Sequence, residues 1–173
     1  MKRILTVFAL LIITQSCSLR IKEVPLIGTY PEPPFIALSD KSFEDVWSNL
    51  IDLFAQNGLG ITLIDKSSGL IIASKTRLSW TFEDKEGKPL KADADVVLSK
   101  KIDPGPMRPY KPSYCAGDWN VRIKVLPNGK TSINVNLLNI DAYILHGNAG
   151  EKLYLKAKST GRLEKIISEK INQ

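Results

Sequence analysis

The sequence predicts an α+β domain of two layers, in which an N-terminal and a C-terminal helix cover one face of an antiparallel sheet. Three observations predict this class. A helical apolar pattern occupies residues 42–58, several segments of alternating apolar and polar residues follow it, and a second helical pattern occupies residues 159–171. One face of the sheet is expected to be apolar, and the two amphipathic helices are available to cover it.

The chain begins with the features of a secretory signal peptide over residues 1–16. Lys2 and Arg3 follow Met1, and residues 4–14 carry no charge. This apolar run is too short to cross about 30 Å of hydrocarbon, for which a helix needs about 20 residues. We therefore expect a cleaved signal and not a membrane span.

Cys17 lies where the apolar run gives way to polar sequence. The segment "IITQSC" resembles a bacterial lipobox, in which a small residue, here Ser16, precedes a cysteine that carries lipid; Thr14 and Gln15 depart from the usual pattern. The alternative is an ordinary signal peptide cut nearby, which leaves Cys17 as a plain thiol. We expect lipid, including palmitate, on Cys17. Resemblance to enterobacterial lipoproteins implies that an Asp after this cysteine would retain the protein at the inner membrane, so Ser18 favours the outer membrane, facing the periplasm. Acyl chains contribute about 0.8 kcal/mol per buried CH₂, so two of them hold the protein firmly.

Charge and cysteine content restrict the possible partners. The chain has 24 Lys and Arg against 18 Asp and Glu, and loss of Lys2 and Arg3 leaves 22 against 18, a net charge of +4. This mild excess suits anionic envelope surfaces but not a nucleic-acid interface, which needs clustered cations. Without Cys17, Cys115 has no intrachain partner, so we expect its thiol to be buried.

Residues 17–38 are interpreted as the lipidated cysteine and a Pro-rich tether, and residues 39–173 as a single domain. Four prolines make this segment semi-rigid, namely Pro25, Pro31, Pro33 and Pro34. A first short strand is expected near its end, over Phe35 to Leu38.

The first helix is predicted from "SFEDVWSNLIDLFAQNG". Ser42 suits the N-cap and Gly58 the residue that ends the helix. The apolar residues form one core stripe, consisting of Phe43, Trp47, Leu50, Ile51 and Phe54.

Strands are predicted over residues 60–65 and 70–76, flanking a turn at 66–69, and over residues 77–84 and, more weakly, 94–99. Residues 118–138 predict a hairpin. A two-residue turn at Asn128-Gly129 would place the two apolar rows on opposite faces, whereas a three-residue loop over residues 127–129 pairs Ile123 with Ile133 and Val125 with Thr131. We therefore predict the three-residue loop. Less regular sequence follows, and then a closing helix with an apolar stripe of Leu163, Ile166, Ile167 and Ile171.

The segments "SFEDVWSNLIDLFAQNGLGITLIDKSSGLIIAS", "NVRIKV" and "STGRLEKIISEKI" resemble bacterial envelope lipoproteins with a helix-grip domain. In particular, they are similar to the NlpB-type accessory lipoprotein of the outer-membrane β-barrel assembly machinery. The likeness covers residues 35–83 and 119–171. It implies a membrane-tethered interaction module without enzymatic activity, although this chain has room for one such domain where the family member carries two.

Candidate catalytic and metal-binding residues are sparse. His146 is the only histidine and has no serine nearby in a nucleophile context, so a structural role at a strand end is the interpretation. Asp93 and Asp95 offer two carboxylates for calcium, but a solvated strand end explains them better. We expect no enzyme, no metal and no cofactor other than the covalent lipid.

Residues 99–118 combine four prolines, four cations and two tyrosines, and they are expected to lack regular structure. A segment of this length inside a compact domain is usually functional or disordered. The hypothesis is that it contacts an envelope protein or an anionic envelope component through Arg108, Tyr110, Lys111 and Tyr114. The alternative is a mobile, solvated insertion.

A second functional hypothesis follows from the predicted architecture. A helix-grip fold can hold a lipid or another apolar ligand between helix and sheet, which would make the protein a carrier. The walls would be Trp47, Phe54, Trp80, Val121 and Ile123, and the same residues can instead close on one another as core.

Overall fold

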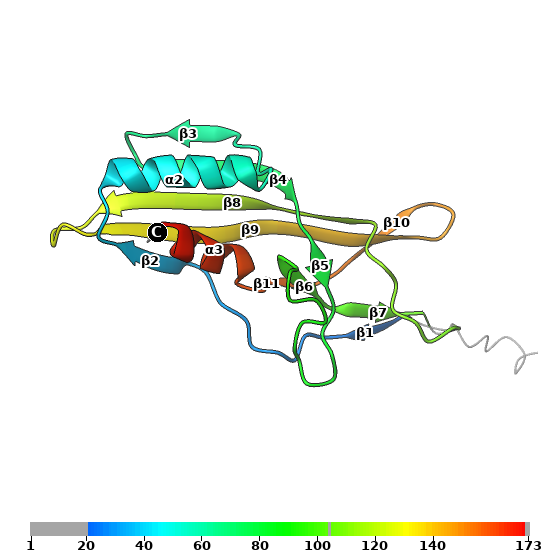
Figure 1. Ribbon diagram of the computed structural model, residues 1–173. Helices are drawn as coiled ribbons and strands as arrows, with labels where there is room; N and C mark the ends of the chain where they lie inside the picture. The colour runs from blue at the N-terminus through cyan, green and yellow to red at the C-terminus, as the bar shows by residue number, and fades with distance from the viewer. Residues whose placement is uncertain (1–20, 104, 172–173) are drawn as a thin grey trace, which may run out of the picture.

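A computed structural model describes residues 21–103 and 105–171 of the chain. The protein is α+β, with two helices and antiparallel sheets that make up most of the regular structure (Figure 1). The helices are α2 (Phe43–Gln56) and α3 (Arg162–Ile171). The strands are β1 (Lys22–Val24), β2 (Phe35–Ser39), β3 (Leu63–Asp65), β4 (Leu70–Arg77), β5 (Trp80–Thr81), β6 (Val96–Leu98), β7 (Lys100–Ile102), β8 (Tyr114–Val125), β9 (Thr131–His146), β10 (Glu151–Tyr154) and β11 (Ala157–Ser159).

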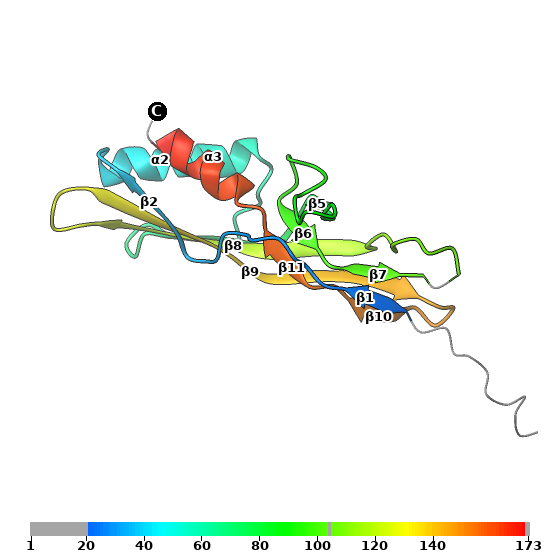
Figure 2. The same cartoon turned by 90° about the horizontal axis from the view of Figure 1, so that it is seen from below.

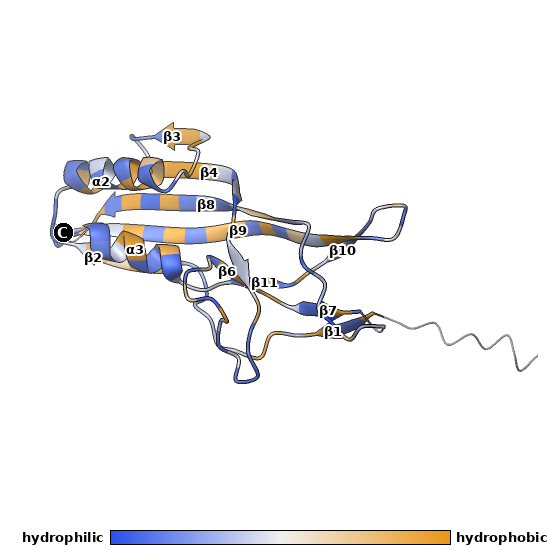
Figure 3. Cartoon of the chain, turned by 45° about the vertical axis from the view of Figure 1, so that its right-hand side comes forward, coloured by the Kyte–Doolittle hydropathy of each residue, from blue (hydrophilic) through white to orange (hydrophobic). Residues whose placement is uncertain are grey.

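The main sheet has six strands in the order β10-β9-β8-β4-β3, with β2 also paired to β9. Its centre is the long hairpin of β8 and β9, along which apolar and polar residues alternate (Figure 3). β9 pairs with β8 along one edge, and its other edge is shared by β2 near one end and β10 near the other. The sheet therefore extends well beyond the part beside which the helices lie (Figure 1).

The hairpin register confirms the prediction of a three-residue loop. Ile123 pairs with Ile133 and Val125 with Thr131. The Leu126 N–H donates to the Lys130 carbonyl at 2.8 Å, which closes the loop over residues 127–129. Gly129 adopts a φ of 81°, the left-handed conformation that this loop requires at its last position.

Helix α2 begins and ends where the sequence predicts. The Ser42 side chain accepts a hydrogen bond from the Asp45 N–H at 3.2 Å, which is the N-cap bond. Gly58 follows the C-cap with a φ of 66°. The buried residues of α2 contribute to a core that they share with α3 and the main sheet.

The core lies between the helices and the hairpin. In Figure 2 both helices are on the same side of β8 and β9. Their contacts run from α2 to β8, from α3 to β2 and between the two helices. The largest fully buried side chains include Leu50, Phe54, Trp119, Ile123, Ile133 and Ile167. Burial of each such side chain contributes about 1.5–3 kcal/mol before the entropy cost of ordering it.

The structure revises the expected tether over residues 17–38. β1 pairs with β7 and β2 pairs with β9, so residues 22–39 lie on the domain. Between them, the N–H groups of Ile27 and Gly28 both donate to the Glu83 carboxylate at 2.9 Å, and the Tyr30 hydroxyl donates to the Gly87 carbonyl at 2.9 Å. The expected strand over Phe35 to Leu38 is confirmed.

Two smaller sheets complete the fold. One is the β1–β7 pair, and the other has the order β11-β6-β5, in which β5 and β6 are parallel. The expectation that residues 99–118 lack regular structure is wrong at both ends, because β7 and the start of β8 lie within them. The weakly predicted strand near residues 94–99 is β6, all of whose residues are buried. In the part of the chain that the structure describes, neither helix has the length and apolarity to cross a membrane.

Candidate functional site

The candidate site begins where the main sheet changes register. Lys75 in β4 and Asn139 in β9 both have positive φ values, 51° and 50°, which is unusual for residues other than glycine. The pairing of β4 with β8 shifts after Ala73, and the pairing of β8 with β9 shifts after Ala116. Such bulges commonly redirect side chains beside a functional surface.

Asp118 holds the two bulges together. Its carboxylate accepts a hydrogen bond from the Lys75 backbone N–H at 2.7 Å and another from the Asn139 Nδ2 at 2.9 Å. These bonds, that from Asn139 first, lower the pKa of Asp118. One carboxylate on β8 thereby fixes the strained backbone of both neighbouring strands.

Beyond the bulges, three tyrosines form a row across β8, β9 and β10. Tyr114 pairs with Tyr143, and Tyr143 pairs with Tyr154. The first two rings are stacked with centroids 5.3 Å apart, and the Tyr143 and Tyr154 rings meet edge to face at 6.0 Å. We call Tyr114, Tyr143 and Tyr154 the tyrosine row.

The tyrosine row is accessible to solvent and contacts the ammonium group of Lys152. Tyr114 is 38% exposed and Tyr154 is 60% exposed. The Lys152 Nζ lies 4.4 Å from the centroid of the Tyr143 ring, a cation–π contact worth about 0.5–1 kcal/mol at an exposed site. Exposed tyrosines bring large, rigid contact area at low entropy cost, so they are enriched at protein interfaces.

Two adjoining cavities lie alongside the tyrosine row. The larger, about 580 Å³, extends from the β4–β5 connection to residues 112–116, and the smaller, about 450 Å³, extends over β9 and β10. Lys75, Tyr114 and Ala116 line both cavities. The charged residues lining the two cavities are Lys75, Arg77, Lys91, Asp93, Asp118, Asp141 and Lys152.

This surface combines an exposed aromatic row with charges of both signs beside two cavities. Its aromatic residues are of a type that is enriched at protein interfaces. Among the described residues, no group of three or more His, Cys, Asp or Glu side chains could hold a metal ion.

The structure separates the residues predicted to bind a partner. Tyr114 is the first member of the tyrosine row. Tyr110 is half-buried, and its ring meets the His146 ring edge-on with centroids 5.6 Å apart. Burial, and then the hydrogen bond to Asp103, raise the pKa of the Tyr110 hydroxyl. Arg108 and Lys111 are exposed in the loop that leads from β7 to β8.

The five residues proposed to line an apolar pocket do not lie around one cavity. Trp47, Phe54, Val121 and Ile123 are buried in the core. Trp80 is half-buried, lies 5.3 Å from the Phe82 ring and lines the larger cavity. The first four close on one another, as the alternative interpretation expects.

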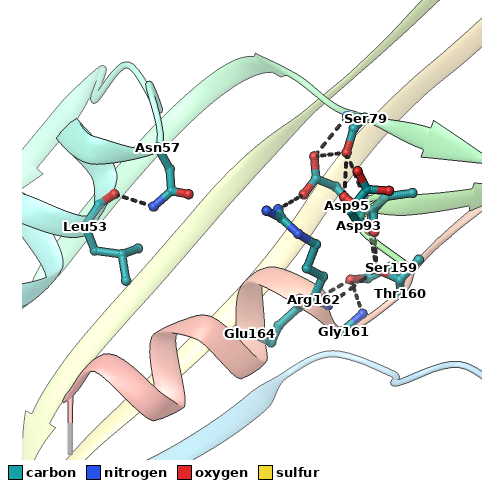
Figure 4. A network of polar contacts seen from close by, with 11 residues as sticks. Leu53, Asn57, Ser79, Asp93, Asp95, Ser159, Thr160, Gly161, Arg162 and Glu164 are labelled. Carbon is teal, nitrogen blue, oxygen red and sulfur yellow. Dashed lines mark hydrogen bonds and ion pairs between the residues drawn. The ribbon is translucent and has the colours of Figure 1, made fainter. Parts of the chain in front are cut away.

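Asp95 lies at a structural junction rather than at an open strand end. Its carboxylate accepts hydrogen bonds from the Ser79 N–H at 2.9 Å and the Ser79 hydroxyl at 2.7 Å, and it pairs with Arg162 at 2.9 Å (Figure 4). This network joins the β4–β5 connection to the start of α3. Asp93 instead lines the larger cavity.

Cys115 is buried, as expected from its solitary position. Burial, and then the charges of Asp95 and Asp141, raise the pKa of its thiol to about 12. The thiol is therefore protonated and unreactive at neutral pH. Cys17, the expected lipidation site, and the signal peptide over residues 1–16 lie outside the described residues.

Sequence reasoning missed Tyr143, Lys152 and Tyr154. They fall in the stretch after residue 138 where the regular alternation of the hairpin is interrupted, so alternation predicts no regular strand there. The available signal was the spacing of aromatic and apolar residues in "DAYILHG" and "EKLYL", which continues the strand pattern once a bulge is allowed.

Comparison with known proteins adds no assignment to these observations. No protein-family model matches the chain, and no curated protein matches its sequence significantly.

Proposed function

We propose that this protein is a non-enzymatic interaction module of the bacterial cell envelope, anchored by lipid on Cys17 to the outer membrane and facing the periplasm. The signal-peptide pattern and the lipobox-like cysteine support the location. The tyrosine row carries the proposal for the function, because it is an exposed, preorganised aromatic surface flanked by cavities. A partner protein that docks on this row is the expected ligand.

The revised N-terminal segment supports a short connection between lipid and domain. Four residues lie between Cys17 and β1 at Lys22, so the five steps from one Cα to the next span at most about 18 Å when extended. β1, β7 and β10 lie at the same end of the molecule, opposite the C-terminus (Figures 1 and 2). The tyrosine row is therefore proposed to work close to the membrane surface, where its partner would also be located.

The fold proposed for this module is a two-layer, helix-grip-like arrangement. Both helices lie on one side of the main sheet in Figure 2, and Leu50, Phe54 and Ile167 share a core with Trp119 of β8. The resemblance to NlpB-type lipoproteins makes outer-membrane assembly complexes the first place to seek the partner.

The anchor is tested by metabolic labelling with radioactive palmitate. We expect label on the wild-type protein and none on Cys17→Ser, which should leave the membrane fraction. Cys115→Ser is the matched control and should label like the wild type. A wild-type protein without label, or a Cys17→Ser protein that stays with the membranes, would contradict the anchor.

The interaction surface is tested by photo-crosslinking in intact cells. A crosslinking amino acid at Tyr154 should give a specific adduct with a partner protein. The same probe at Val125, which is equally exposed at the hairpin end of the sheet, should give none. Tyr143→Ser, with the probe kept at Tyr154, should reduce the adduct, and equal adducts from both probe positions would refute the assignment.

A further inference from the structure

A separate cavity lies in the gap between β2 and β10 on the edge of β9. β2 pairs with residues 131–135 of β9 and β10 with residues 143–146, which leaves the middle of this edge without a strand. A cavity of about 220 Å³ occupies this place, bordered by β11, by the segment before β2 and by the start of α3. It shares no lining residue with the two cavities at the tyrosine row.

The walls of the cavity are mostly apolar. Its apolar lining residues are Pro31, Pro33, Phe35, Val135, Leu137, Ile140 and Ala157. The polar lining residues are Glu32, Lys158, Ser159 and Glu164. Glu32 and Lys158 are exposed and form an ion pair with each other at 2.5 Å, so their charges balance at the rim.

Glu164 is the buried charge of this cavity. It lies in the first turn of α3 and is only 4% exposed. Its Oε1 receives a hydrogen bond from the Ser159 hydroxyl at 2.6 Å, and the Gly161 N–H in turn donates to the same hydroxyl at 3.1 Å (Figure 4). No group among the described residues donates a hydrogen bond to Oε2, although this atom is buried.

The cations near Glu164 are committed elsewhere. Arg162 pairs with Asp95 at 2.9 Å, and Lys158 pairs with Glu32. A buried carboxylate without a cation or a full set of donors is costly, so such groups are normally paired. A carboxylate in an apolar cavity is suited to receive a positively charged donor from outside the chain.

We propose that this cavity binds a primary alkylammonium group, whose alkyl stem packs on the apolar walls while the ammonium donates to Glu164. A guanidinium binds a carboxylate best through both oxygens in a fork, and here Oε1 is already engaged by Ser159. An ammonium is a compact charge that needs only the free oxygen. Its source is a lysine side chain of a protein or a free diamine, and both present the same chemistry.

The proposal is tested by NMR titration of the full protein with n-butylammonium chloride and, separately, with 1-butanol. Saturable shifts of the backbone amides of residues 157–164 are expected with the amine, at a Kd at least 10-fold lower than that of the alcohol. Glu164→Gln should raise the Kd of the amine at least 10-fold. Glu169→Gln changes an exposed carboxylate on the same helix and should leave the Kd unchanged.

A second variant tests the cavity without touching the carboxylate. Ile140→Trp should fill the space from β9 and abolish the response to the amine. Equal responses to amine and alcohol, or an unchanged Kd in Glu164→Gln, would overturn the proposal. Nα-acetyl-lysine amide and cadaverine then distinguish the sources, since the tighter of the two identifies a protein side chain or a free diamine. Because the tyrosine row is not involved, this result is independent of the crosslinking experiment.

Discussion

At the residue scale, Asp118 shows how one side chain stabilises an unusual backbone. Lys75 and Asn139 both lie in the left-handed region, and both donate a hydrogen bond to the Asp118 carboxylate. The bonds compensate for the strain of the two positive φ values. The tyrosine row follows directly after these bulges, so its position depends on a residue that is not itself part of it.

We predict that Asp118→Asn lowers stability by about 1 kcal/mol at pH 7. The pKa of Asp118 is lowered in the folded state, so its contribution is present above the ordinary carboxyl value of about 3.9 and is lost as pH falls through the lowered value. The difference between wild type and variant should therefore shrink below about pH 4. Urea unfolding across this pH range measures it, with Asp52→Asn on the exposed side of α2 as the control.

The two cysteines give a second prediction at this scale. Cys115 is 6% exposed with a pKa raised to about 12, so its native thiol should not react with a thiol reagent at pH 8. After unfolding in guanidinium it should react fully. If Cys17 is acylated, the native protein should show no reactive thiol and the unfolded protein one; a rapidly reacting native thiol that Cys17→Ser removes would argue against the lipid.

At the scale of elements, turns depend on how closely backbone segments approach. Gly69 has a φ of 70°, and a Cβ there would lie 2.1 Å from the Ile123 carbonyl oxygen. Gly129 has a φ of 81°, but a Cβ there would meet nothing within 4 Å. Both positions require a left-handed backbone, but only a Cβ at residue 69 would collide with a neighbouring atom.

Alanine at the two glycines should therefore have unequal effects. Gly129→Ala is expected to cost about 1–2 kcal/mol from the left-handed backbone alone. Gly69→Ala should cost clearly more, because Ile123 must move and its N–H bond to the Gly69 carbonyl, 2.8 Å long, is disturbed. Equal midpoints in denaturant unfolding of the two variants would contradict this account.

Helix α3 offers a test of the core. Ile167 is fully buried, whereas Lys165 on the same helix is exposed. Ile167→Ala should lower stability by about 2–5 kcal/mol through lost burial and a new cavity, and Lys165→Ala should change it by less than about 0.5 kcal/mol. Thermal unfolding followed by circular dichroism separates the two outcomes, and a small effect at Ile167 would show that α3 contributes little to the core.

At the scale of the whole molecule, the N-terminal segment belongs to the fold. Glu83 is 4% exposed and accepts hydrogen bonds from two successive N–H groups, those of Ile27 and Gly28. The Tyr30 hydroxyl adds a bond to the Gly87 carbonyl. These bonds fasten the segment between β1 and β2 to the loop of residues 83–89, which shortens the free chain between the expected lipid and the domain.

Glu83→Ala should release this segment without unfolding the core. We expect thermolysin to cleave the variant within residues 24–34 at least several-fold faster than the wild type, and residues 40–171 to persist. Glu86→Gln alters an exposed carboxylate of the same loop and should leave the cleavage rate unchanged. Protection of the segment in Glu83→Ala would show that β1 and β2 alone are sufficient to hold it.

Local patterns were sufficient for the elements whose residues interact mainly with near neighbours. The cap at Ser42, the end of α2 at Gly58 and the loop over residues 127–129 follow from side-chain and backbone preferences within a few residues. The bulge at residues 138–141 was beyond such reasoning, because it shifts the phase of β9 from buried Val135 and Leu137 to buried Ala142 and Ile144. A prediction from strict two-residue alternation therefore ends the strand at residue 138 and does not place Tyr143 in it.

The sequence by itself determined the α+β class, the limits of α2, the register of the hairpin and the burial of Cys115, since periodicity and local turn chemistry specify them. Only the tertiary structure decided that the proline-containing segment lies on the domain, that three tyrosines from separate strands form one row, and that Glu164 borders an apolar cavity. These features join residues that are far apart in the sequence, such as Tyr30 and Gly87, which are 57 positions apart, and Glu32 and Lys158, which are 126 positions apart. Contacts between residues so far apart depend on the packing of the whole chain, and the residue pattern within one segment does not predict them.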